Sequence, residues 1–247
     1  MASPTKNIGY IAAGLIVLYA IGQFTQFGSN DEAANTPVMP NWAAIASWPG
    51  IDAAEVEALP DPNRVYTAIV LDDSGSMGQD MEAAKTAVLA SLEAMKDTDA
   101  VAVIALNDGL ILPFMAVADA RTALPAPLSR VFSDGSTPLT RALKTARQGL
   151  AEEAAKVGGF GTYRILVTTD GVADNGDLLR AEIEDIARQT PIQIATIGVG
   201  LTGQHVLRRP DLAAFVSVSD VSGLADALRT AIAEEQVFSA ITSFGSE

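Results

Sequence analysis

The feature that most constrains the fold of this chain is an apolar run that stops abruptly at an acidic, hydroxyl-rich loop. Residues 69–71 (IVL) have the character of a buried strand end, and residues 72–77 (DDSGSM) follow directly. Mg²⁺ prefers oxygen ligands in a near-octahedral arrangement. A strand that ends in a tight loop can direct the Asp72 carboxylate and the Ser74 and Ser76 hydroxyls at one point. Alone, such a loop is a weak signal, because polar residues fill turns for many reasons.

Two downstream segments supply further oxygen ligands. Residues 133–139 (SDGSTPL) place the hydroxyl of Thr137 just before a predicted helix, and residues 165–171 (ILVTTDG) are a second apolar strand that ends at Asp170. Open α/β sheets bind their ligands outside the carboxyl ends of the strands. If the two strands are neighbours, one crevice receives both carboxylates, from Asp72 and Asp170.

Together these segments resemble the metal-ion-dependent adhesion site of von Willebrand factor type A (VWA) domains. That family carries Asp-x-Ser-x-Ser after its first strand, a distant Thr, and an Asp in a Thr-Asp-Gly turn after the fourth. The matching positions here are Asp72, Ser74, Ser76, Thr137 and Asp170, and the resemblance extends over about residues 65–235. It implies that a metal site of this kind is present in the chain.

The resemblance also implies a role for each of these residues. Ser74 and Ser76 are expected to bind the metal directly, whereas Asp72 and Asp170 act mainly through water. Thr137 is expected to bind directly or through water, depending on the conformational state. The expected ion is Mg²⁺, with Mn²⁺ or Ca²⁺ as alternatives, and the Glu or Asp carboxylate of a protein partner would complete its coordination.

Strands and helices alternate over the rest of the predicted domain. Apolar runs predict strands over residues 65–71, 101–106, 110–114, 163–168, 192–199 and 214–218. Apolar positions three and four residues apart predict helices over residues 81–95, 139–150, 177–186 and 224–232, and Asp177 is expected to cap the third of these. Such a pattern predicts a doubly wound, mostly parallel α/β sheet with helices on both faces. The Asn107-Asp108-Gly109 turn indicates a hairpin, and the resemblance places its second strand antiparallel at one edge.

The N-terminal part is predicted to anchor the chain in a membrane. Residues 8–27 are mostly apolar and uncharged, and about 20 such residues span a bilayer as a helix. Lys6 precedes this run and acidic residues follow it, so residues 1–7 are expected in the cytoplasm. The large domain would then lie outside an inner or plasma membrane, in the periplasm of a Gram-negative cell. A cleaved signal peptide is the alternative interpretation.

Residues 28–63 are predicted to be a tether, because five prolines prevent long regular elements. Within it, Asn41 is expected to cap a short helix that carries Trp42, Ile45 and Trp48. Packing of these tryptophans against the folded domain is favoured over a membrane-surface or partner-binding patch. The folded domain is expected at residues 64–238, with a short tail at 239–247.

Composition and missing motifs exclude several functional classes. The chain has 247 residues, of which 49% are hydrophobic, and its net charge of −14 argues against binding to nucleic acid or anionic lipid. It has no cysteine, so disulfides and thiolate metal sites are excluded. Neither G-x-x-x-x-G-K-[ST] nor G-x-G-x-x-G is present, so nucleotide binding has no support.

We expect a binding protein rather than an enzyme. A Ser74–His205–Asp170 triad can be written, but the G-x-S-x-G elbow of serine hydrolases is absent, and His205, the only histidine, is expected on a helix surface. The unmatched acids Asp73, Asp134 and Asp174 are expected to be solvated.

The expected function is capture of a partner carboxylate by a membrane-anchored domain. The alternative is a structural subunit of a cell-envelope assembly, in which the metal only stabilises loops.

Overall fold

The computed structural model describes residues 38–50, 61–201, 205–209 and 211–233. The predicted membrane anchor at residues 8–27 and the tail at 239–247 lie outside these ranges, as do parts of the tether. Within the described ranges, every helix is too short or too polar to cross a membrane.

A six-stranded sheet with the order β3-β2-β1-β4-β5-β6 forms the centre of the domain. Its strands are β1 (Val65–Leu71), β2 (Ala100–Ala105), β3 (Gly109–Ala116), β4 (Thr162–Thr169), β5 (Gln193–Val199) and β6 (Ala214–Val218). All neighbouring pairs are parallel except β2 and β3, which are antiparallel. This confirms the predicted mostly parallel sheet with one antiparallel edge strand.

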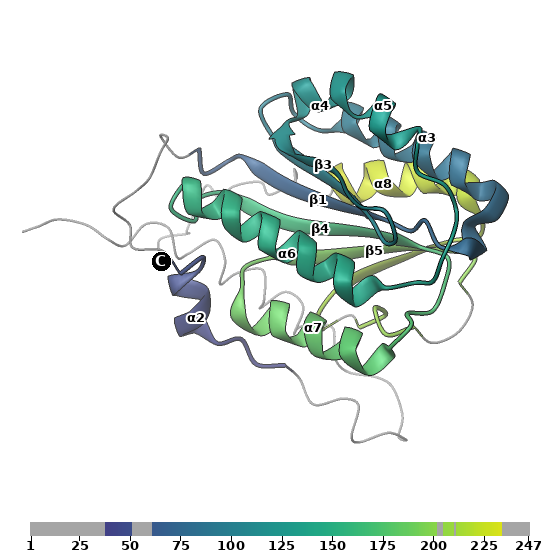
Figure 1. Ribbon diagram of the computed structural model, residues 1–247. Helices are drawn as coiled ribbons and strands as arrows, with labels where there is room; N and C mark the ends of the chain where they lie inside the picture. The colour runs from purple at the N-terminus through teal and green to yellow at the C-terminus, as the bar shows by residue number, and fades with distance from the viewer. Residues whose placement is uncertain (1–37, 51–60, 202–204, 210, 234–247) are drawn as a thin grey trace, which may run out of the picture.

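Helices cover both faces of this sheet (Figure 1). One face carries α3 (Met81–Ser91), α4 (Val117–Ala123), α5 (Pro125–Leu128) and α8 (Leu224–Ala233), and the other carries α6 (Leu139–Lys156) and α7 (Gly176–Gln189). The pleat of β1 divides its side chains between the two layers. Ile69 and Leu71 pack into the α3 and α8 layer, whereas Ala68 and Val70 pack into the α6 and α7 layer. The central strand is therefore buried on both sides.

The start of α7 differs in detail from the prediction. Asn175, and not Asp177, caps the helix, because its side chain accepts a hydrogen bond of 3.0 Å from the Leu178 N–H. Asp177 lies in the first turn, where a negative charge is favourable against the helix dipole.

The described part of the tether packs against the domain at the amino ends of the strands. Asn41 caps α2 (Trp42–Ser47) as predicted, accepting a hydrogen bond from the Ala44 N–H at 3.2 Å. The Trp48 ring meets the Tyr163 ring edge-on, with 4.8 Å between their centroids. Trp42, however, is 49% exposed. The packing prediction is therefore confirmed for Trp48, whereas Trp42 faces solvent.

Candidate metal centre

The strand order creates a crevice at the carboxyl ends of β1 and β4. The chain leaves β1 through α3 on one face of the sheet and reaches β4 through α6 on the other. Such a reversal point is where open α/β sheets bind ligands. Leu71 lies opposite Thr168 in the register, so Asp72 and Asp170 leave the sheet at adjacent points.

Four of the five predicted ligands are joined by short contacts at this crevice. The Ser76 hydroxyl donates a hydrogen bond of 2.7 Å to Asp170 Oδ1. The Ser74 and Ser76 hydroxyl oxygens lie 3.0 Å apart. Asp72 is fully buried, and its Oδ1 accepts a hydrogen bond of 2.9 Å from the Ser74 N–H. Its Oδ2 accepts one of 2.6 Å from the Thr169 hydroxyl.

The fifth predicted ligand, Thr137, reaches the same crevice beside Gly171. A β-carbon built on Gly171 would lie 3.3 Å from Thr137 Oγ1 and 3.6 Å from Ser76 Oγ. The absence of a side chain there leaves space next to both hydroxyls. Asp174 holds the Thr137 loop in place, because its Oδ1 accepts a hydrogen bond of 2.8 Å from the Thr137 N–H. The structure thus brings all five predicted residues to one place.

Asp73 is a structural clamp, which corrects its prediction as a solvated acid. Its side chain is fully buried. Oδ1 accepts hydrogen bonds from the Asn107 N–H at 2.8 Å and side-chain amide at 3.1 Å, and Oδ2 accepts one from the Asp108 N–H at 3.1 Å. The Asn107 amide also donates to the carbonyls of Asp134 and Ser136, each at 2.9 Å. The clamp therefore ties the β1 loop, the hairpin and the Thr137 loop together.

The other two unmatched acids are exposed, as predicted, but they are not equivalent. Among the described residues, the Asp134 side chain accepts only a local hydrogen bond of 2.7 Å from the Gly135 N–H. Asp174 is bonded to the Thr137 loop, since its Oδ2 also accepts a hydrogen bond of 2.6 Å from the Ser136 hydroxyl. Asp174 therefore positions the candidate site without belonging to the predicted ligand set.

His205 lies buried behind the site, so its prediction as a helix-surface residue is wrong. Nδ1 accepts a hydrogen bond of 3.1 Å from the Leu207 N–H, which leaves Nε2 to donate to the Gly171 carbonyl at 3.0 Å. Burial lowers the pKa of His205, and this outweighs the opposing effect of the Gly171 carbonyl. The described hydrogen bonds of the His205 ring are with the backbone of Gly171 and Leu207. Among the described residues, the Ser74 hydroxyl contacts Ser76 and makes no hydrogen bond to the His205 ring.

The donor chemistry of the site suits a hard divalent cation. Its members offer three hydroxyls and two carboxylates, the oxygen ligands that Mg²⁺ and Ca²⁺ prefer. Among the described residues, no cluster of three or more His, Cys, Asp or Glu side chains is arranged to hold a metal ion. Burial raises the pKa of Asp170, the Ser76 hydrogen bond opposes this rise, and the nearby Asp72 adds to it.

Fold and site together define a doubly wound α/β domain with an oxygen-rich crevice at its switch point. Residues 67–172, a range that contains all five candidate ligands, match the family model described as von Willebrand factor type A domain. An uncharacterized protein of Synechocystis sp. is 29% identical over 167 residues, covering 66% of this chain. The chain spans 39% of the length of that relative.

Solved structures with low sequence identity share the fold. A von Willebrand factor type A protein from Catenulispora acidiphila has a TM-score of 0.58 and 21% identity, covering 69% of this chain and 42% of that one. The pilus adhesin SpaC from Lactobacillus rhamnosus GG has a TM-score of 0.59 and 15% identity, and the match covers 73% of this chain and 31% of SpaC. Manganese-loaded TRAP protein from Plasmodium vivax has a TM-score of 0.52 and 14% identity, and the match covers 69% of this chain and 74% of the TRAP chain.

The family model thus matches the central part of this chain, and these solved structures share its fold.

Proposed function

We propose that this chain is a membrane-anchored protein-binding module that captures a partner carboxylate through Mg²⁺ held at the crevice. The observation that carries the proposal is the convergence of Ser74, Ser76 and Asp170 within short contacts. Thr137 lies across Gly171 from Ser76. A bound Mg²⁺ would supply positive charge and an open coordination position, and Mn²⁺ or Ca²⁺ could take its place.

The protein's own residues would each contribute something different. Ser74 and Ser76 offer hydroxyl oxygens directly at the crevice. Asp72 and Asp170 supply negative charge, with Asp72 oriented by the Ser74 N–H and the Thr169 hydroxyl. The solved TRAP structure is manganese-loaded and SpaC is a pilus adhesin. Those are properties of these two proteins, and they support metal-dependent adhesion as the proposal for this one.

The described part of the tether supports an orientation with the crevice directed away from the anchor. Trp48 contacts Tyr163 near the amino end of β4, whereas Asp170 follows its carboxyl end. A chain that enters at one end of the sheet would present the opposite end to its surroundings. The membrane anchor at residues 8–27 and an exterior domain remain part of the proposal, based on the sequence.

Two alternatives have less support. A metal that only stabilises loops has little to add, because hydrogen bonds from Asn107 to Asp73 and from Thr137 to Asp174 already join these loops. A serine hydrolase would need a base at Ser74. The described contacts of the Ser74 hydroxyl lead to Ser76 and not to His205.

The test is capture of membrane proteins by the full chain with and without metal. Tagged wild-type chain and the Thr137→Ala variant are expressed in the native membrane, solubilised and purified in Mg²⁺ or in EDTA. We expect at least one partner that is retained in Mg²⁺, lost in EDTA and lost from Thr137→Ala. Thr86→Ala, at an exposed position on α3, is the matched control and should retain it. Partners that stay bound through both EDTA and Thr137→Ala would support the structural-subunit alternative.

A further inference from the structure

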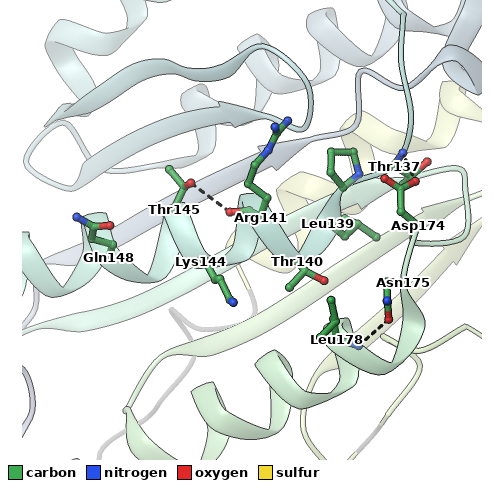
Figure 2. A pocket seen from close by; sticks show the side chains of 11 residues that line it. Thr137, Leu139, Thr140, Arg141, Lys144, Thr145, Gln148, Asp174, Asn175 and Leu178 are labelled. Carbon is green, nitrogen blue, oxygen red and sulfur yellow. Dashed lines mark hydrogen bonds between the residues drawn. The ribbon is translucent and has the colours of Figure 1, made fainter.

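A groove of about 410 Å³ runs from the candidate metal site along the surface between α6 and α7. It begins at Thr137 and Asp174 and extends past Lys144 to Gln148. In Figure 2, Thr140 and Lys144 of α6 lie on the side of the helix that faces Leu178 of α7. A partner that binds at the metal site can therefore extend along this groove.

Lys144 is the cation that this groove offers to a partner. Its side chain is 65% exposed, and Glu182 Oε2 lies 4.0 Å from its Nζ. Glu182 is itself buried and is also approached by Arg147, which makes a contact of 2.5 Å with Asp185. Arg141, the other groove cation, turns away and donates a hydrogen bond of 2.6 Å to the Leu106 carbonyl (Figure 2). Lys144 therefore presents a positive charge on the surface of a chain with a net charge of −14.

The α7 wall of the groove carries an exposed apolar side chain. Leu178 is 58% exposed, although it lies in the first turns of a helix whose Leu179, Ile183 and Ile186 are buried. An exposed leucine alone needs no explanation. Here it lines the same groove as Lys144, and that groove begins at the candidate metal site, so a partner can cover it.

The spacing of these groups sets the spacing of a partner's side chains. Lys144 lies five residues after Leu139, where α6 begins, so the helical rise between them is about 7.5 Å, and Thr137 lies two residues before that start. A peptide in the extended polyproline II conformation covers about 9 Å in three residues, at about 3.1 Å each, and its side chains three positions apart lie on the same side. A carboxylate at the metal position is then followed, three residues later, by a side chain at Lys144.

We propose that the partner contributes an extended segment with two acidic residues three positions apart. The first acid completes the metal site at Thr137, and the second pairs with Lys144. An apolar side chain between them covers Leu178. This inference rests on the proposed function and adds a specificity to it, because a single carboxylate would occur on almost any protein surface.

Peptide selection on the full chain tests the inference. The wild-type chain in detergent, with Mg²⁺, is used to pan a phage library of random dodecapeptides, and bound phage are eluted with EDTA. We expect enrichment of acid pairs at i and i+3 with an apolar residue between them. Synthetic versions of an enriched peptide, with either acid changed to its amide, are then titrated by fluorescence anisotropy.

The contributions of the two peptide acids to binding should depend on different parts of the protein, the first on the metal site and the second on Lys144. Changing the second acid to its amide should weaken binding to wild type by about two- to fivefold, the range of an exposed ion pair. The same change should have no effect on Lys144→Gln, whereas EDTA should still release the peptide from that variant. Lys96→Gln, at an exposed site beyond the amino end of β2, is the matched control and should behave as wild type.

The outcomes separate this inference from the proposed function. EDTA-eluted peptides with one essential acid, bound equally by wild type and Lys144→Gln, would overturn the inference and leave metal-dependent capture standing. No EDTA-eluted peptide from the wild type would overturn both. Mg²⁺-dependent self-association of the chain that Lys144→Gln abolishes would assign the groove to a second copy and also overturn the inference.

Discussion

The Ser76 hydroxyl donates a hydrogen bond of 2.7 Å to Asp170 across 94 positions of sequence. The two residues follow neighbouring parallel strands, and the strand register brings the loops that carry them to the same edge of the sheet. Neither has a local reason to meet the other. Their contact is the most direct sign that the β1 loop and the β4 loop form one site.

Replacing Asp73 should destabilise the domain more than replacing its exposed counterpart Asp134. Asp73→Ala leaves the N–H groups of Asn107 and Asp108 without their carboxylate acceptor, and the expected loss in unfolding free energy is about 2–3 kcal/mol. Asp134→Ala, at an exposed loop position, should change it by less than about 0.5 kcal/mol. Urea unfolding followed by circular dichroism checks both. Equal effects would show that Asp73 is not a clamp.

The strands were predictable from local patterns, whereas the convergence of the five site residues was predictable from the resemblance to VWA domains. Continuous apolar runs mark buried parallel strands, and the acids at their ends lie at one edge of the sheet. The roles of Asp73 and His205 could not be read in this way, because each depends on hydrogen bonds to distant backbone groups. The only signal for Asp73 was an acid directly after a strand in a chain that also holds an Asn-Asp-Gly turn.

Trp48 should contribute to the stability of the domain, whereas Trp42 should not. Trp48→Ala removes the edge-on contact with Tyr163, and we expect a loss of about 1–2 kcal/mol in unfolding free energy. Trp42→Ala is the matched control, because that ring is 49% exposed. Denaturant titration of the full chain in detergent compares the two variants. If Trp48→Ala is as stable as wild type, the tether does not dock on the domain.

The stability of the domain should depend on pH through His205. Burial lowers its pKa in the folded protein below the usual 6.5, so the unfolded chain binds the proton more readily. The stabilising contribution is therefore present above about pH 6.5 and is lost as pH falls below that value. His205→Gln should remove this part of the pH dependence. Thermal unfolding between pH 5 and pH 8 measures it, and parallel profiles for the two chains would contradict the assignment.

The proposed membrane topology predicts that the C-terminus lies outside the cytoplasm. A reporter enzyme that functions only in the periplasm, fused after Glu247, should be active in a Gram-negative host. Protease added to intact spheroplasts should digest the domain. Digestion only after lysis would reverse the orientation, and release of a shortened soluble chain would favour a cleaved signal peptide.

The central claim is that the crevice binds one divalent cation, and calorimetric titration of the purified full chain with Mg²⁺ or Mn²⁺ tests it most directly. Wild type should bind one ion per chain. Ser76→Ala, which removes a hydroxyl that contacts Asp170, should lose most of this binding, whereas the exposed control Ser129→Ala should retain it. Far-ultraviolet circular dichroism should show that all three chains are folded. Equal binding by wild type and Ser76→Ala, or none by wild type, would contradict the account.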